Sequence, residues 1–321
     1  MPIPDFDGVG VLVTGGTGFI GSHLVDALVE RRARVRVLDD LSSGNLGNLV
    51  HHGDAVELQR GDVRDVEACR RACHGAQWVF HLAALVSVPR SLDDPASTIA
   101  VNVTGTANLF AAAHEAGASR VVYASSSSVY GDHEGVPQRE GEEGAPLSPY
   151  AASKAMDEQL AAVLARSVGQ QLVGLRFFNV YGPRQDPAGP YAAVIPRFLA
   201  AARRGAPLEI HGDGEQSRDF VYVTDAVEAA LLAAGAPPEA CGAAYNVAGG
   251  ERVTMNELAA RVTEISRSRV PPVHVAPRAG DVRHSLADLT ASTEKLGYSP
   301  RVSIAVGLDR LWRAASQTQA T

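Results

Sequence analysis

The sequence predicts an α/β fold in which a doubly wound parallel sheet is followed by a smaller α/β domain. Two observations predict it: short apolar strands alternate with helices through the first half of the chain, and a glycine-rich turn follows the first strand. Near-continuous apolar strands are typical of parallel sheets covered on both faces and joined by right-handed crossovers. Ligands of such sheets lie across the carboxyl ends of the strands.

Apolar runs and helical periodicity give the elements in chain order. In the first half, strands are predicted at residues 11–14, 34–38, 55–60, 78–82, 120–124 and 172–177, and helices near 20–28, 65–73, 96–116 and 149–168. The second half is less regular. It contains helices near residues 192–203, 224–234, 254–267 and 303–316, and a strand at 208–210.

The turn after the first strand carries glycines at positions 15, 18 and 21 and then continues as a helix. The free N–H groups and the dipole of a helix start favour a diphosphate, and glycine lets the phosphate approach the backbone closely. The glycines are three residues apart, which differs from the commoner G-x-G-x-x-G pattern. The turn predicts a dinucleotide site.

Asp39 ends the second strand, 18 residues after Gly21. A dinucleotide fold presents an acid to the adenosine ribose at this place, and a carboxylate repels a 2′-phosphate, so we predict NAD rather than NADP. The alternative is that Asp39 only caps the loop at residues 40–44. At the next strand end, residues 61–63 reach the adenine or form a simple turn, and His81 is interpreted as a structural residue.

Bulk properties exclude several classes of partner. The chain has 321 residues and a net charge of −7, which argues against nucleic-acid or anionic-membrane binding. Its three cysteines do not complete a metal site, so no metal is expected. The N-terminus lacks a signal-peptide pattern and no run reaches 18 apolar residues, so we predict a cytoplasmic protein.

Tyr150 and Lys154 lie one turn apart on a predicted helix, after a strand that ends in the serines at positions 125–128. A tyrosine in water has a pKa of about 10. A lysine cation together with a positive nicotinamide ring favours the phenolate. This pair therefore predicts a tyrosine base with a serine hydroxyl beside it.

These motifs resemble one family. The chain is similar to the extended short-chain dehydrogenases/reductases of the nucleotide-sugar epimerase and dehydratase group. The resemblance rests on residues 14–22, 39–45, 81–85, 150–154, 176–184, 212–220 and 280–288. It implies a Rossmann NAD-binding domain at residues 1–178 and a nucleotide-sugar domain at 179–321, with the chain crossing back to the first domain at about 220–248.

The resemblance also implies the site residues. Tyr150 is the expected base, Lys154 its partner, Ser126 the catalytic hydroxyl and Ser127 the next candidate. Residues expected to contact NAD are Gly15, Gly18, Phe19, Ile20, Asp39, Asp40, Ser42, Asp62, Val63, Leu82, Ala83, Ala84, Asn102, Tyr150, Lys154 and Phe177. Residues expected to contact the UDP-sugar are Ser87, Asn179, Val194, Ile195, Ile210, Arg218, Arg278, Asp281 and Ser285.

The family's dehydratases carry an Asp-Glu pair after the catalytic hydroxyl, where this chain has Ser127 and Ser128, and its decarboxylases carry a glutamate at the second position. The missing carboxylates favour 4-epimerisation through a 4-keto intermediate. By resemblance, the small Ser285 admits an N-acetyl group, which favours UDP-GlcNAc and UDP-GalNAc and also allows UDP-Glc and UDP-Gal.

Alternatives are an epimerase of another NDP-hexose, such as a uronic acid or a deoxy or unsaturated sugar, an NDP-sugar dehydratase or reductase, and a non-catalytic NAD-binding sensor. Sensors of this superfamily lose the tyrosine or the lysine, and this chain keeps both. Alanine-rich faces on the helices near 96–116 and 149–168 predict a homodimer, as in the family.

Overall fold

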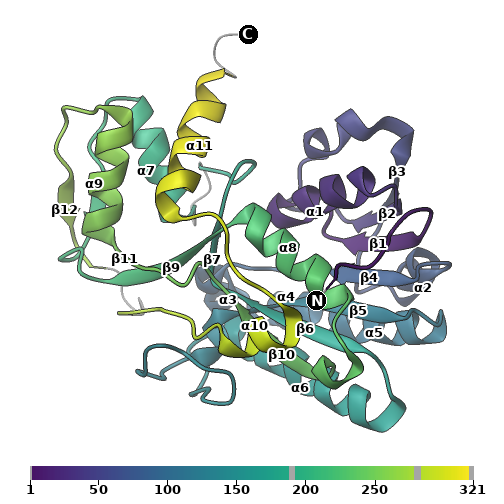
Figure 1. The fold of residues 1–321 in the computed structure, drawn as a ribbon. Helices are drawn as coiled ribbons and strands as arrows, with labels where there is room; N and C mark the ends of the chain where they lie inside the picture. The colour runs from purple at the N-terminus through teal and green to yellow at the C-terminus, as the bar shows by residue number, and fades with distance from the viewer. Residues whose placement is uncertain (1, 188–191, 278–282, 318–321) are drawn as a thin grey trace.

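A computed structural model describes residues 2–187, 192–277 and 283–317 (Figure 1). Its larger sheet has seven strands. They are β1 (Gly10–Thr14), β2 (Arg34–Asp39), β3 (Val56–Arg60), β4 (Trp78–His81), β5 (Arg120–Ser126), β6 (Leu172–Phe177) and β10 (Ala243–Val247).

All neighbouring strands of this sheet are parallel, in the order β10-β6-β5-β4-β1-β2-β3. The order reverses between β1 and β4, so a crevice opens at their carboxyl ends. This arrangement confirms the predicted doubly wound parallel sheet. The first-half strands form where the sequence predicted them, and the inner strands β1, β4, β5 and β6 have apolar runs that are mostly buried, whereas the edge strand β3 is largely exposed.

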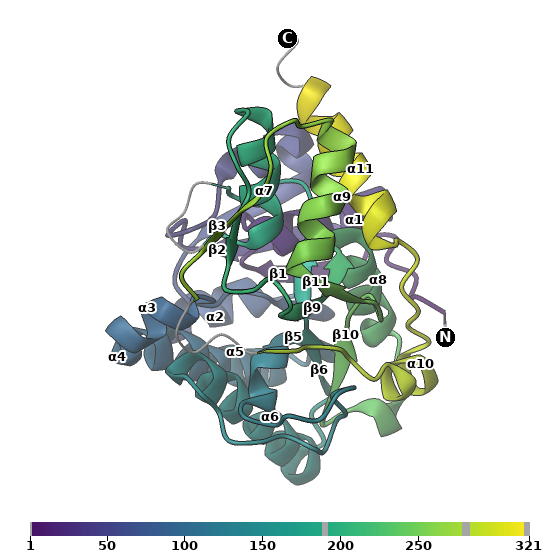
Figure 2. The ribbon, with the colours of Figure 1, turned by 90° about the vertical axis from the view of Figure 1, so that its left-hand side faces the viewer.

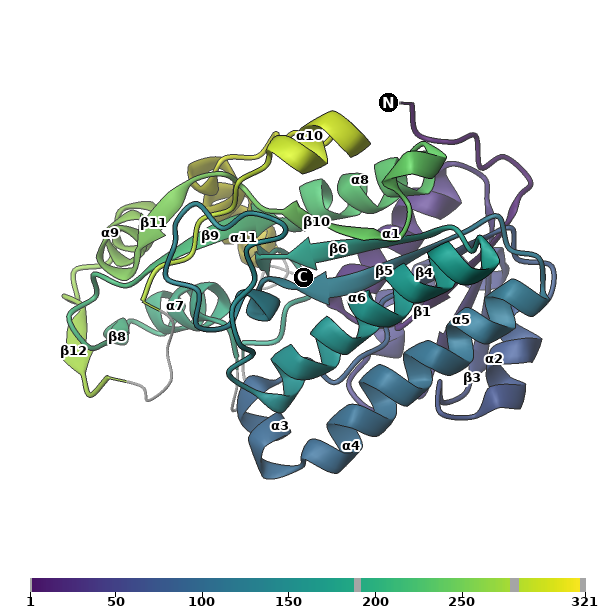
Figure 3. The same ribbon diagram turned by 90° about the horizontal axis from the view of Figure 1, so that it is seen from below.

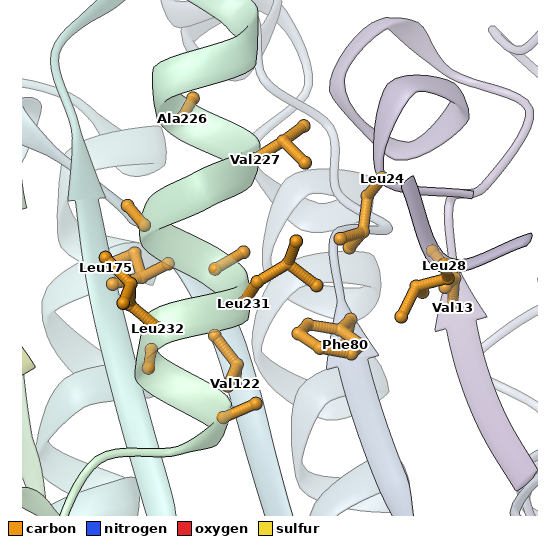
Figure 4. Close-up of a cluster of buried hydrophobic side chains, with 14 of the residues drawn as sticks. Val13, Leu24, Leu28, Phe80, Val122, Leu175, Ala226, Val227, Leu231 and Leu232 are labelled. Carbon is orange, nitrogen blue, oxygen red and sulfur yellow. The ribbon is translucent and has the colours of Figure 1, made fainter. Parts of the chain in front are cut away.

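Alternating strand residues supply a separate core on each face of the sheet. One core packs α1 (Phe19–Glu30) and α8 (Val223–Ala234) on the sheet, with Leu231 of α8 near Phe80 of β4 (Figure 4). The other packs α2 (Val66–Cys73), α5 (Gly105–Glu115) and α6 (Pro149–Val168) on the opposite face (Figure 3). The sheet is therefore rigid where its strand ends carry the ligand crevice.

The chain beyond β6 builds a second unit and also returns to the first. The second unit has the sheet β11-β9-β7, the pair β12-β8 and the helices α7, α9 and α11, which lie together in Figure 2. Their bounds are β7 (Asn179–Tyr181), α7 (Val194–Arg203), β8 (Glu209–His211), β9 (Ser217–Tyr222), β11 (Arg252–Thr254), α9 (Met255–Ser266), β12 (Val273–Val275) and α11 (Ile304–Gln317).

In the sequence, α8 and β10 lie between β9 and β11. In space, α8 covers the large sheet and β10 pairs with β6 at the edge of that sheet. A further helix, α10 (Thr290–Leu296), contacts both α8 and β10. The domain boundary after residue 178 stays a sequence-based prediction.

The helix predicted near residues 96–116 is interrupted. It comprises α4 (Pro95–Ile99), a π-helical turn η3 (Ala100–Thr104) and α5, and it is preceded by a short helix α3 (Val88–Asp93) that the sequence did not predict. Such π turns are frequent at functional sites. The remaining helical turns are the 3₁₀ segments η1 (Leu46–Asn48), η2 (Val50–Ala55), η4 (Ser127–Tyr130) and η5 (Pro238–Ala240).

Within the described ranges, none of the helices has both the length and the apolar character needed to span a lipid bilayer.

Candidate active site

A cavity of about 350 Å³ lies at the carboxyl ends of the large sheet. Its walls are the turn before α1, the ends of β2, β4, β5 and β6, and the first turns of α6. Apart from Asn102, every residue predicted to contact NAD lines it: Gly15, Gly18, Phe19, Ile20, Asp39, Asp40, Ser42, Asp62, Val63, Leu82, Ala83, Ala84, Tyr150, Lys154 and Phe177.

The glycine turn is shaped for a close backbone approach. Gly15 has φ +69°, and a Cβ there would lie 2.8 Å from the backbone nitrogen of Ala83. A Cβ on Gly21 would lie 2.1 Å from the carbonyl oxygen of Gly15. α1 begins without a side-chain cap and has no acidic residue in its first turn. Its uncapped N-terminus faces the cavity and fits the diphosphate of a dinucleotide.

Asp39 is buried at the end of β2 and faces the same cavity. Its Oδ2 accepts a hydrogen bond from the backbone N–H of Thr17 at 3.0 Å, and its Oδ1 accepts one from Leu41 at 2.9 Å. Each carboxylate oxygen can accept a second hydrogen bond. The group therefore holds the loop and can still accept from ribose hydroxyls, so the two interpretations of Asp39 are compatible.

His81 is buried and lies between two threonine hydroxyls. Its Nδ1 lies 2.7 Å from Oγ1 of Thr14 and its Nε2 lies 2.9 Å from Oγ1 of Thr106. Burial, followed by the positive charge of Lys154, lowers the pKa of His81 to about 3. A neutral ring that ties β1, β4 and α5 together agrees with the structural role expected for it.

Asn102, which was expected to contact NAD, does not line the cavity, and its contact with NAD stays a prediction. Its side chain is fully buried in the π turn. The amide donates to the carbonyl of Leu85 at 3.1 Å and to Oγ of Ser153 at 3.0 Å, and its Oδ1 accepts from the N–H of Leu85 at 2.8 Å. Asn102 therefore positions Leu85, which does line the cavity.

The start of α6 places the tyrosine and the lysine. Oγ of Ser148 accepts from the backbone N–H of Ala151 at 3.1 Å, and Pro149 occupies the first helical position, which together fix where the helix begins. Tyr150 and Lys154 then lie one turn apart and both line the cavity. They are buried, with exposures of 8% and 2%.

Lys154 has an acidic neighbour that the sequence analysis did not single out. Its Nζ donates to Oδ2 of Asp157 at 3.2 Å, and both side chains are buried. Burial raises the pKa of Asp157 to about 6, although the charge of Lys154 opposes this shift. The sequence feature that could have indicated this ion pair is the (i, i+3) spacing of Lys154 and Asp157 on one helix.

The serines after β5 are separated by the structure. Ser126 lines the cavity, and its Oγ accepts from the backbone N–H of Ser128 at 3.1 Å. Ser127 begins η4 and is not part of the lining. Of the two candidates for the catalytic hydroxyl, Ser126 is the one placed beside Tyr150 and Lys154.

A second cavity of about 230 Å³ lies among β7, α7, β8 and β9. Five residues predicted to contact the UDP-sugar line it: Asn179, Val194, Ile195, Ile210 and Arg218. Val180 lines both cavities, so the two sites adjoin at β7.

The remaining predicted substrate residues lie elsewhere. Oγ of Ser87 caps α3 by accepting from the N–H of Arg90 at 3.2 Å. Ser285 is buried at 7% exposure, and its N–H donates to the carbonyl of Ser217 at 3.1 Å. Neither lines one of the two cavities. Arg278 and Asp281 lie outside the described residues.

Several lining residues were not predicted. Ser43 and Gly44 follow Asp40 and Ser42 directly, so an extension of that motif would have found them. Further lining residues lie within stretches that the sequence analysis quotes but were not named as contacts, such as Leu85, Ser125, Phe178, Val180 and Gln216. Others, such as Val86 and Val101 in the larger cavity and Arg197 in the smaller one, have no local motif.

Comparison with known proteins identifies the family of this chain. Residues 11–248 match the model of the NAD dependent epimerase/dehydratase family. A UDP-glucose 4-epimerase of Mycolicibacterium smegmatis is 39% identical over 92% of this chain and 95% of that protein.

Two solved structures are also similar. A UDP-N-acetylglucosamine 4-epimerase from Methanobrevibacter ruminantium M1, in complex with UDP-N-acetylmuramic acid, superposes with a TM-score of 0.91 at 38% identity and covers 97% of this chain and 99% of its own. A UDP-glucose 4-epimerase from Thermotoga maritima, with UDP-glucose, has a TM-score of 0.91 at 38% identity. The match covers 97% of this chain and 100% of that one. These matches confirm the resemblance drawn from the motifs. The chain is therefore an enzyme of the NAD-dependent epimerase/dehydratase family, with NAD as its cofactor.

Proposed function

We propose that this enzyme is a UDP-sugar 4-epimerase that interconverts UDP-GlcNAc and UDP-GalNAc and also accepts UDP-glucose and UDP-galactose. The observation that carries the proposal is that Tyr150, Lys154 and Ser126 line one cavity together with the glycine turn. NAD, when bound, supplies a hydride acceptor for the sugar C4 and then the donor.

Three residues of the cavity carry out the proton transfer. Tyr150 takes the proton from the sugar O4 and returns it later, which is general base and then general acid catalysis. The cation of Lys154 favours the phenolate form of Tyr150. Ser126 shares the O4 proton through its hydroxyl. A proton and a hydride that both return to the sugar give no net oxidation.

The distribution of carboxylates favours epimerisation over elimination. Eliminating water from the sugar needs a second acid and base beside the tyrosine, and Ser127 and Ser128 stand where the dehydratases carry them. Among the described lining residues, the carboxylates are Asp39, Asp40 and Asp62, which follow β2 and β3 rather than β5. The serines that follow β5 therefore offer no carboxylate as the second acid and base of an elimination, and epimerisation does not require one.

The second cavity suits the nucleotide part of the substrate. It combines a cation, Arg218, with apolar walls from α7 and β8, and it meets the first cavity at Val180. A diphosphate bound there would extend its sugar toward Tyr150. The three similar proteins named above, one UDP-N-acetylglucosamine 4-epimerase and two UDP-glucose 4-epimerases, support this class of substrate.

Pairing of two copies through α5 and α6 is part of the proposal. α6 exposes Met156 and Val163, whose exposed fractions are 45% and 47%. Exposed apolar side chains beside small residues on one helix face favour close helix packing between subunits.

The proposal is tested by incubating the purified protein with UDP-GlcNAc and no added cofactor while the anomeric protons are followed by NMR. We expect a UDP-GalNAc signal that grows to equilibrium. A 4-keto-6-deoxy product would instead identify a dehydratase, and steady turnover of free NADH would identify a reductase.

Ser285 lines neither cavity, and its place beside the C2 substituent of the sugar is what the family resemblance implies. On that basis, substitution of Ser285 by tyrosine is expected to lower kcat/KM for UDP-GlcNAc by about 100-fold and to spare UDP-glucose, because the larger side chain removes the space for the N-acetyl group. Ser285→Ala is the matched control and should keep both activities. Steady-state kinetics with UDP-GlcNAc and with UDP-glucose give the ratio of the two kcat/KM values for each variant. An equal loss for both substrates would remove Ser285 from sugar selection.

Replacement of Asp157 by asparagine is expected to change the pH profile rather than abolish activity. With a pKa of about 6, Asp157 is ionised above pH 6 and offsets the charge of Lys154. The variant lacks this offset, so its phenolate forms more readily and the acidic limb of kcat/KM moves down by about one pH unit. The two profiles should converge below pH 6, where the wild-type carboxyl is protonated.

The control for this experiment is Asp309→Asn, which removes an exposed carboxylate from an ion pair on α11. Profiles of kcat/KM between pH 5 and 9 are compared for the three proteins. An Asp157→Asn profile that overlays the wild type would show that Asp157 does not act on the base through Lys154.

A further inference from the structure

Asp26, His51 and His52 form a cluster outside both cavities. Asp26 lies on α1, and the two histidines lie on η2. Nε2 of His51 is 3.2 Å and Nε2 of His52 is 2.8 Å from the same oxygen, Oδ1 of Asp26. One nitrogen of each histidine and one oxygen of the aspartate all lie within 4.8 Å of one another. The cluster thus presents three donor atoms to a single point.

The carboxylate of Asp26 is held from its other side. Its Oδ2 lies 2.8 Å from Nη2 of Arg184, which follows β7 in the chain. Nε2 of His23, one turn before Asp26 on α1, lies 3.0 Å from the carbonyl oxygen of Pro183. Because Arg184 occupies Oδ2, Oδ1 is left facing the imidazoles, and such outer hydrogen bonds are what orient a metal-binding carboxylate.

Two imidazole nitrogens and one carboxylate oxygen are ligands that Zn²⁺ and related divalent ions take. The side chain of His52 is 9% exposed and that of His51 is 50% exposed, so one side of the cluster is walled by protein and the other is open to water. Three protein ligands with an open position leave room for a water molecule as the fourth.

We propose that Asp26, His51 and His52 bind a divalent transition-metal ion of the zinc class. In forming the site, the imidazoles act as neutral ligands and release any proton they carry. The ion replaces the two hydrogen bonds to Oδ1 with metal–ligand bonds while Arg184 keeps Oδ2. The site ties α1 to η2, which belongs to the same connection between β2 and β3 as the cavity residues Ser42 and Gly44.

The competing interpretation is an ordinary surface network of histidines, aspartate and arginine. Two observations favour the metal: both Nε2 atoms lie within 3.2 Å of the same oxygen, and the ring centroids of His51 and His52 are 4.0 Å apart with the planes tilted by 40°, which keeps the two imidazoles together. The charge of Arg184 opposes a dication, and its position on the far carboxylate oxygen keeps it off the ligand side.

The test uses the full chain without an affinity tag, stripped with a chelator and then dialysed. Zn²⁺ is titrated by calorimetry, and Co²⁺ is added as a spectroscopic probe of nitrogen and oxygen ligation. We expect one ion per chain in both measurements. The variants His52→Ala and Asp26→Asn should each weaken Zn²⁺ binding by about 100-fold or more.

His114→Ala is the matched control, because it removes an exposed histidine of α5 that lies outside the cluster. It should bind Zn²⁺ as the wild type does. Circular dichroism and sugar turnover in chelator report the folding of each variant, and both should be unchanged in His51→Ala. The proposal is overturned if the wild type binds no ion, or if His52→Ala and Asp26→Asn bind it as tightly as His114→Ala.

Discussion

Replacing Tyr150 by phenylalanine is expected to lower kcat for the sugar conversion by about 10²–10⁴-fold, the usual contribution of a general acid or base. The change removes one oxygen and leaves the ring, so the wall of the cavity stays in place. NAD should remain bound, because the glycine turn and Asp39 are untouched. The measurements are turnover by NMR and the NAD released when the purified variant is denatured.

Tyr123→Phe provides the matched control for Tyr150→Phe. Tyr123 is buried in β5, its hydroxyl has no hydrogen-bond partner within the described structure, and it does not line the cavity. Removing that hydroxyl should leave turnover unchanged. If Tyr150→Phe kept the wild-type rate, the proton would have to pass through another group, and Ser126 would be the next candidate.

Six of the seven strands of the large sheet were predicted from the sequence, and the edge strand β10 was not. Strands buried on both faces have unbroken apolar runs, and β6 was predicted with its observed bounds. α6 was also predicted with its observed bounds, since Ser148 and Pro149 mark its start and Gly169, with φ +69°, ends it.

The strands of the second unit were mostly missed because they are short and polar and depend on partners far along the chain. β11 pairs Arg252 with Asp219, and β9 pairs Phe220 with Asn179. No local period marks such strands, whose hydrogen bonds are completed only when distant segments meet. The π turn at Asn102 was missed for a similar reason, since its helix shows no break in the sequence.

The site divides in the same way. Residues that belong to a local motif, such as Gly15 and Tyr150, were predicted as contacts and line the cavity. Asn102 and Lys154 were predicted as contacts of NAD, but the hydrogen bond between Asn102 and Leu85 and the ion pair between Lys154 and Asp157 were not, because these contacts form only in the folded chain. The sequence therefore identifies the groups that contact the ligand more readily than the groups that position them.

Asp219→Ala is expected to destabilise the fold by about 3–5 kcal/mol, since several buried donors lose their acceptor at once. Asp219 is fully buried in β9. Its Oδ1 accepts from the N–H groups of Gly249 at 2.8 Å and Gly250 at 3.0 Å, and its Oδ2 accepts from Ala287 at 3.1 Å. One carboxylate thus ties β9 to the loop after β10 and to the segment that carries Ser285.

The loss is measured by urea unfolding at pH 8, because burial raises the pKa of Asp219 to about 6 and the carboxylate is ionised there. Asp213→Ala is the control: it breaks an ion pair with Arg283 in which both side chains are more than half exposed, and such pairs contribute about 0–1 kcal/mol. Equal losses for the two variants would mean that water satisfies the freed N–H groups, and that the segment around Ser285 is held mainly by its backbone hydrogen bonds to Ser217 and Gln138.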